Sequence, residues 1–68
     1  MTQSEIRENE EYFDFLFTLQ NSGVTNMFGA ASYLQREFPN LSRSEAIAIL
    51  SVWIDNYEEI AAELKATI

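Results

Sequence analysis

The sequence predicts an all-helical protein, a three-helix bundle in which the second and third helices have a helix-turn-helix-like arrangement. Apolar residues recur every three or four positions along most of the 68 residues. No stretch alternates with a period of two for long enough to predict a strand. Gly23 and Pro39 divide the chain into three segments. The length fits a single helical domain covering residues 1–68.

The first helix is expected from Ser4 to Ser22. Thr2 or Ser4 can cap its N-terminus, and the acidic residues that follow suit the positive end of the helix dipole. Gly23 suits the left-handed residue that often ends a helix. Apolar side chains along this segment spread over roughly 200° of its surface, which is wider than one neighbouring helix normally covers.

The second helix is expected to start after Thr25 and to end near Phe38. Gly29 would then lie inside the helix, where it costs about 1 kcal/mol relative to alanine, and it would permit close approach of another backbone. Pro39 disfavours helix at the residue before it and so closes the segment. One face is predicted to point inward: Met27, Ala30, Ala31, Leu34 and Phe38.

The third helix has the clearest start signal in the chain. Ser42 and Glu45 have the spacing of a capping box, and Leu41 can pack on Ala46 as the accompanying hydrophobic staple. An apolar stripe then runs from Ala46 to Leu64 by alternating steps of four and three, which predicts one helix about 35 Å long. Further apolar residues widen this inward stripe: Ile47, Ile49, Ile54 and Ala61.

Several chemistries are excluded by missing residue types. The chain has no cysteine and no histidine, which removes disulfides, thiolate chemistry, the commonest general base and the commonest metal ligand. Carboxylate pairs at helical spacing, such as Glu10 with Asp14, are interpreted as solvated helix surface because no apolar residues are expected around them. We therefore expect no enzyme activity, no catalytic residue, no cofactor and no metal site.

The formal net charge of −7 is concentrated at the two ends of the chain. Residues 1–14 carry a net −4 and residues 55–68 a net −3, whereas the middle is neutral. Such a surface repels polyanions, so nucleic acid is not an expected partner. The longest nearly apolar run, Ala46 to Ile54, is about half of a bilayer span, and the first residues lack the pattern of a signal peptide. These features predict a cytoplasmic protein with no membrane association.

A chain of this length buries a modest share of its surface, and association with another chain is the stabilising device left open. The wide apolar arc of the first helix and the distal stripe of the third predict a homodimer. A two-fold interface would cover both copies at once. The function expected is therefore a protein–protein interaction module that self-associates, with a further protein partner of unknown identity. Its predicted interface residues are Tyr12, Phe15, Leu19, Trp53, Tyr57 and Ile60.

Two alternatives remain open. The first is a helix-turn-helix nucleic-acid binder, although the outward residues of its third helix would include one cation, Arg43, and an aspartate, Asp55. The second is an acidic decoy that mimics DNA and occupies a basic protein. This decoy requires the carboxylates of the first and third helices to line one continuous face.

The middle of the chain, from Ser22 to Trp53, resembles a pattern in small proteins of bacteriophages and their environmental relatives. Its most specific part is the run SGVTNMFGA from Ser22 to Ala30. The rest consists of Tyr33-Leu34, Leu41-Ser42, Glu45-Ala46, Ile49-Leu50 and Trp53. That family has no assigned activity, so the resemblance implies a bacterial or phage-infected cytoplasm and no chemistry. A fainter likeness to ubiquitin-associated three-helix domains lacks their Met-Gly-Phe order.

Overall fold

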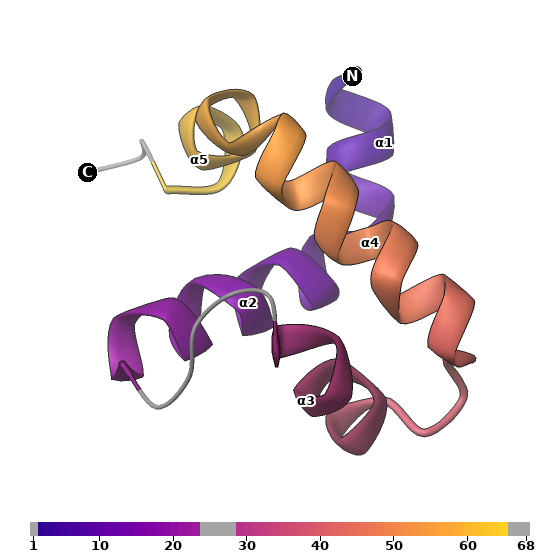
Figure 1. Cartoon of the computed structure of the whole chain (residues 1–68). Coiled ribbons are helices and arrows are strands. Elements are labelled where there is room, and N and C mark those ends of the chain that lie inside the picture. Colours follow the sequence, from indigo (N-terminus) through magenta and orange to yellow (C-terminus); the bar gives the residue numbers. More distant parts are fainter. Residues whose placement is uncertain (1, 24–28, 66–68) are drawn as a thin grey trace.

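Five helices make up the described part of the computed structural model, which covers residues 2–23 and 29–65 (Figure 1). They are α1 (Gln3–Glu8), α2 (Glu10–Ser22), α3 (Ala30–Glu37), α4 (Arg43–Asp55) and α5 (Tyr57–Lys65). No strand occurs in these residues, so the predicted all-helical class is confirmed. The prediction of three continuous helices is not confirmed, because the first and the third are each interrupted once.

Both interruptions fall on an asparagine. Nδ2 of Asn9 donates to the carbonyl of Glu5, and Nδ2 of Asn56 donates to the carbonyl of Val52, both at 3.0 Å. A side chain that bonds the carbonyl four residues earlier competes with the regular helical pattern and bends the helix. The backbone leaves the helical region at Asn9 (φ −110°, ψ 17°) and at Asn56 (φ −120°, ψ 26°). Each asparagine therefore ends one helix, and the next begins in a new direction (Figure 1).

The predicted helix ends are confirmed where they depend on local hydrogen bonds. The N–H of Glu5 donates to Thr2 Oγ1 at 3.2 Å, and the N–H of Thr2 donates to Glu5 Oε1 at 3.0 Å. The same reciprocal pair joins Ser42 and Glu45, at 3.1 and 2.8 Å. Gly23 ends α2 in the left-handed conformation, with φ 69°. Such conformations favour glycine because it has no Cβ.

The start of the second predicted helix needs a correction. Helix α3 begins at Ala30, and Gly29 is its N-cap residue, so Gly29 precedes the helix and does not lie inside it. Thr25 and Met27, which were expected at the start of this helix, lie outside the described residues. The C-terminal end agrees with the prediction, because the helix stops before Pro39.

One hydrophobic core takes side chains from all five described helices. Helices α3 and α4 pack together most extensively, and α5 folds back against α1 and α2. No helix in the described ranges combines the length and the apolar content that a bilayer crossing demands. The buried residues are Ile6, Phe13, Leu16, Phe17, Leu19, Ala30, Ala31, Leu34, Leu41, Ala46, Leu50, Trp53 and Ile60.

The return of α5 brings the two acidic ends of the chain together. Arg7 Nη2 of α1 lies 2.8 Å from Glu63 Oε2 of α5, and Arg7 Nη1 lies 3.0 Å from Glu10 Oε1. Hydrogen bonds from the Arg7 guanidinium raise its pKa, the bond to Glu10 more than the bond to Glu63. Lys65 Nζ of α5 lies 3.3 Å from Asp14 Oδ1 of α2. These surface pairs contribute little stability, but they place the C-terminal part of α5 beside α1 and α2.

Candidate interaction surfaces

Three of the six predicted interface residues are covered within a single chain. Leu19 is 7% exposed, Trp53 2% and Ile60 0%. The expectation that they form a surface for a second copy is corrected here, because the neighbouring helices already bury them. A partner could reach them only by opening the core.

One aromatic cluster explains the burial of Trp53. Its ring centroid lies 5.3 Å from that of Phe17 on α2 and 5.0 Å from that of Tyr57 on α5, in edge-to-face geometry. The Tyr57 hydroxyl donates to Gln20 Oε1 at 2.9 Å. Edge-to-face aromatic pairs add about 0.5–1.5 kcal/mol to the burial of the rings. This cluster fastens α2, α4 and α5 to one another.

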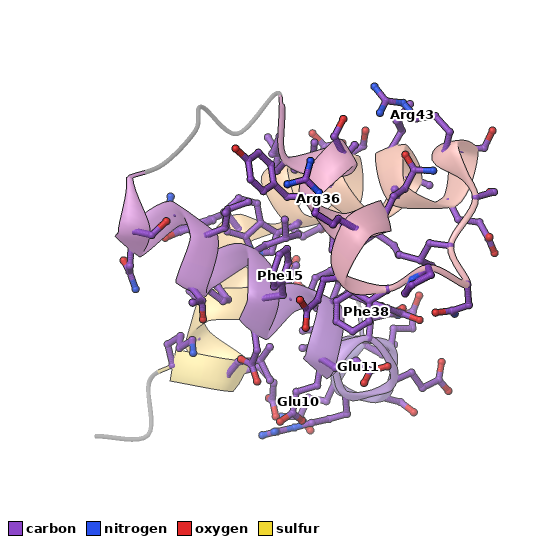
Figure 2. The ribbon with its side chains drawn as sticks, turned by 90° about the horizontal axis from the view of Figure 1, so that it is seen from below. Glu10, Glu11, Phe15, Arg36, Phe38 and Arg43 are labelled. Carbon is purple, nitrogen blue, oxygen red and sulfur yellow. The ribbon has the colours of Figure 1, made fainter. Side chains whose placement is uncertain are left out.

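A second aromatic cluster holds the two other predicted interface residues, Tyr12 and Phe15. Both are half-buried, and both meet the ring of Phe38, with centroids 4.8 Å and 5.9 Å apart. Figure 2 shows Phe15 of α2 close to Phe38, which follows α3. Tyr12 and Phe15 therefore pack on Phe38, in an aromatic cluster separate from the one that holds Trp53 and Tyr57.

The error has a definite cause, which is the break at Asn56. On one straight helix Tyr57 and Ile60 would extend the stripe of Trp53 beyond the reach of the other helices. The bend instead turns α5 back over α2, so these side chains point into the core. The sequence held a signal for the break, because asparagine favours helix ends and two acidic residues follow within the next turn.

The exposed apolar surface lies elsewhere, on α4. Ile47 is 46% exposed, Ile54 42% and Val52 36%, and these are the large exposed apolar residues among those described. At 100° per residue, Ile47 and Ile54 lie on one flank of α4, and Val52 lies on the opposite flank. The sequence had placed both isoleucines in the inward stripe. Helix α4 is apolar nearly all round, yet its neighbours cover only part of it.

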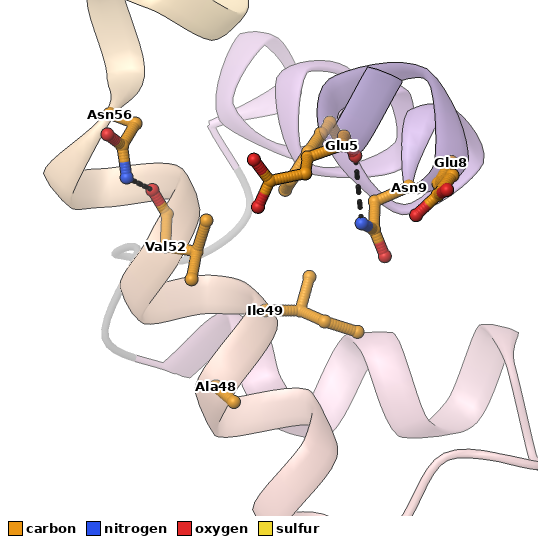
Figure 3. A pocket seen from close by; sticks show the side chains of 8 residues that line it. Glu5, Glu8, Asn9, Ala48, Ile49, Val52 and Asn56 are labelled. Atoms are coloured by element: carbon orange, nitrogen blue, oxygen red, sulfur yellow. Dashed lines mark hydrogen bonds between the residues drawn. The ribbon is translucent and has the colours of Figure 1, made fainter. Parts of the chain in front are cut away.

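A groove of about 470 Å³ runs between α1 and the Val52 flank of α4 (Figure 3). One wall is acidic and polar, and the opposite wall is apolar along most of its length. Buried Phe13 also lines it. The wall residues are Glu5, Glu8 and Asn9 from α1 and the α1–α2 junction, and Ala48, Ile49, Val52 and Asn56 from α4 and the α4–α5 junction. We call this feature the α1–α4 groove.

The carboxylates of the α1–α4 groove, Glu5 and Glu8, belong to the acidic N-terminal segment. Backbone and side-chain hydrogen bonds from Thr2 lower the pKa of Glu5, so this carboxylate is ionised at neutral pH. Residues 1–14 and 55–68 together account for the whole formal charge, −4 plus −3 giving −7. Figure 2 shows Glu10 and Glu11 on the other side of Phe38 from Arg36 and Arg43. The negative charge is thus concentrated in the two end segments, whereas residues 15–54 are neutral.

Comparisons with protein-family models, with curated proteins and with solved structures find no match for this chain. Among the described residues, no group of three acidic side chains is placed to hold a metal ion. The fold and its surfaces therefore define the class, a small acidic all-helical protein with two apolar surface features on α4.

Proposed function

We propose that this protein is a small acidic interaction module that forms a homodimer and also binds other proteins. Two copies pair through one flank of α4, formed by Ile47, Ser51 and Ile54, which we call the α4 outer flank. The observation that carries the proposal is the exposure of two large isoleucines, 46% and 42%, on one flank of the same helix. Covering these two side chains in a dimer would remove further apolar surface from water.

The spacing of the α4 outer flank suits an antiparallel pair of helices. Ile47, Ser51 and Ile54 follow one another by steps of four and three, so they form one stripe. In a two-fold arrangement Ile47 of each copy would lie opposite Ile54 of the other. The small, exposed Ser51 at the centre would let the two backbones approach closely. A two-fold interface of this kind is self-complementary.

The charges of α4 support the same arrangement. Arg43 lies at its start, and Asp55 lies at its end. Arg43 Nη1 donates to Ser32 Oγ at 2.9 Å and to Gln35 Oε1 at 3.4 Å, and no carboxylate pairs with Arg43 among the described residues. An antiparallel partner would bring Arg43 towards Asp55 and Glu58 of the second copy. Both symmetric contacts would then join opposite charges.

Sedimentation velocity over a dilution series tests self-association. Because a contact through one helix is small, we expect a weak dimer with a dissociation constant in the micromolar range or above. Ile47→Lys and Ile54→Lys should each give a monomer over the whole series. Val52→Lys makes the same charge change on the opposite flank of α4 and should leave the dimer intact.

A charge reversal sharpens this test. Arg43→Glu should weaken the dimer, and combining it with Glu58→Arg should restore part of the loss if the two residues meet across the interface. A strict monomer at high micromolar concentration would contradict the proposal. So would an equal effect of Val52→Lys and Ile54→Lys.

A second candidate function is an acidic decoy for a basic, nucleic-acid-binding protein. The observation in its favour is the ion pair of Arg7 with Glu63, which brings the two acidic ends of the chain side by side. The decoy should compete with duplex DNA for such a protein, with an affinity that falls steeply as salt increases.

The helix-turn-helix alternative instead requires α3 and α4 to bind DNA directly, and a mobility shift of duplex DNA at low salt tests it.

A further inference from the structure

We infer that the α1–α4 groove binds an amphipathic helix of another protein, with apolar residues on one face and lysine or arginine along one edge. This inference goes beyond self-association and uses the opposite flank of α4. The two proposals can therefore fail independently. The acidic wall beside the apolar wall specifies the chemistry of the occupant.

The apolar wall offers the contact area that a helix in a groove requires. Val52 is 36% exposed, Ala48 is exposed and Ile49 is half-buried, and buried Phe13 also lines the groove. Val52 and Ala48 are four residues apart, so they stack on one flank of α4 (Figure 3). A partner helix that places apolar side chains at three- and four-residue spacing matches such a wall. The small side chain of Ala48 leaves room for a bulky residue.

The opposite wall supplies acceptors for positive charge. Glu5 and Glu8 are three residues apart on α1, and both line the groove. Nδ2 of Asn9 is bonded to the carbonyl of Glu5, and Figure 3 shows its other amide atom, Oδ1, directed into the groove. Two carboxylates and an amide oxygen therefore lie across from the apolar wall. A lysine or arginine at the edge of the occupant would meet them while its apolar face meets Val52.

A second copy of this chain does not fit that description. The sequence has four cations, and no helix in the described residues carries more than one of them. Arg7 and Lys65 lie in ion pairs, and Arg36 lies over the ring of Tyr33, 5.6 Å from its centroid. The remaining cation, Arg43, lies on the helix that forms the groove. The positive edge must come from a different protein.

The probe is a synthetic amphipathic helical peptide of about three turns, with leucines on one face and lysines along its edges. Two control peptides accompany it: a scrambled one of the same composition, and one with glutamates in place of the lysines. Binding to the whole protein is measured by titration calorimetry. Circular dichroism and thermal melts confirm that each variant is folded, which we expect because every substitution is at an exposed residue.

Two matched pairs of variants locate the site. Val52→Lys places a positive charge on the apolar wall and should weaken binding of the probe at least about tenfold, or 1.4 kcal/mol. Ile54→Lys makes the same charge change outside the groove and should change affinity by less than about twofold. Glu8→Gln should weaken binding by about two- to fivefold, the range of an exposed ion pair. Glu11→Gln, outside the groove, should leave it nearly unchanged.

Several outcomes would overturn the inference. Equal binding of the scrambled peptide would show attraction to net charge alone, and equal binding of the glutamate peptide would remove the role of the acidic wall. Equal effects of Val52→Lys and Ile54→Lys, or no binding at high micromolar concentration to folded protein, would remove the site. If Val52→Lys alone abolished self-association, the groove would hold a second copy instead.

Discussion

The inner and outer sides of α4 are made of similar residues but have opposite environments. Leu50 and Trp53 on the inner side are 6% and 2% exposed, whereas Ile47 and Ile54 on the outer flank are 46% and 42% exposed. The difference comes from the neighbours, because α2, α3 and α5 all pack on the inner side. Apolar character along a helix thus shows that some faces are buried, and the packing partners decide which ones.

This comparison separates residues that stabilise the fold from residues that are free to bind. Burial of an apolar side chain stabilises the chain by about 25 cal/mol per Å² removed from water. The inner residues already contribute this free energy to folding. The outer isoleucines are still partly in contact with water, so their burial by another molecule would stabilise a complex. Substitutions on the two sides should therefore affect different measurements.

The largest expected effect is on the inner side of α4. Leu50→Ala should lower the free energy of unfolding by about 2–5 kcal/mol, because it removes buried methyl groups and leaves a cavity. Ile54→Ala, one turn further on, should change it by less than about 0.5 kcal/mol. Urea denaturation followed by circular dichroism measures both, at a concentration low enough to keep the protein monomeric. Similar losses for the two variants would show that the outer flank is also covered within one chain.

A smaller effect is expected at the junction that turns α5 towards the inner side. Asn56→Ala removes the hydrogen bond from Nδ2 to the carbonyl of Val52 and should lower the free energy of unfolding by about 1 kcal/mol. Asn9→Ala tests the equivalent bond at the other junction, and we expect a similar loss. If Asn56→Ala were as stable as the natural chain, packing of α5 would enforce the bend without the asparagine. That result would show that tertiary contacts alone determine the bend between α4 and α5.

The smallest effect concerns Glu45, an exposed residue at the start of α4. Backbone and side-chain hydrogen bonds from Ser42 lower the pKa of Glu45 below its ordinary value of 4.5. The carboxylate therefore stabilises the folded state above pH 4.5, and this contribution is lost as pH falls through the lower pKa of the folded state. Glu45→Gln keeps the shape and cannot ionise, so its melting temperature should lie slightly below that of the natural chain at neutral pH.

The pH dependence separates the cap from the overall charge. Below pH 4.5 the two melting temperatures should converge, since the carboxylate of the natural chain becomes protonated. Glu37→Gln makes the same charge change away from a capping box and corrects for the net charge. A difference that stayed constant between neutral pH and pH 3 would argue against a role for the capping-box carboxylate.

Features that depend on neighbours in the sequence were predictable from the sequence alone. The helical class, the Ser42–Glu45 capping box and the left-handed Gly23 are all confirmed, because each depends on residues within one turn. The prediction that Ala30 and Leu34 lie on the inward face of α3 is also confirmed, since helical periodicity alone defines that face. The residues that form such local interactions lie close together in the sequence, so the sequence pattern alone indicates them.

The candidate surfaces were decided by the tertiary structure. Whether Asn56 continues or breaks a helix depends on the energy gained when α5 packs on α2, and residues far apart in the sequence supply that energy. The same return of α5 buries Ile60 and joins the two acidic ends, while Ile47 and Val52 stay exposed on opposite flanks of α4. The sequence determined how much apolar surface α4 carries, and only the packing of the other helices determined which part of it stays in contact with water.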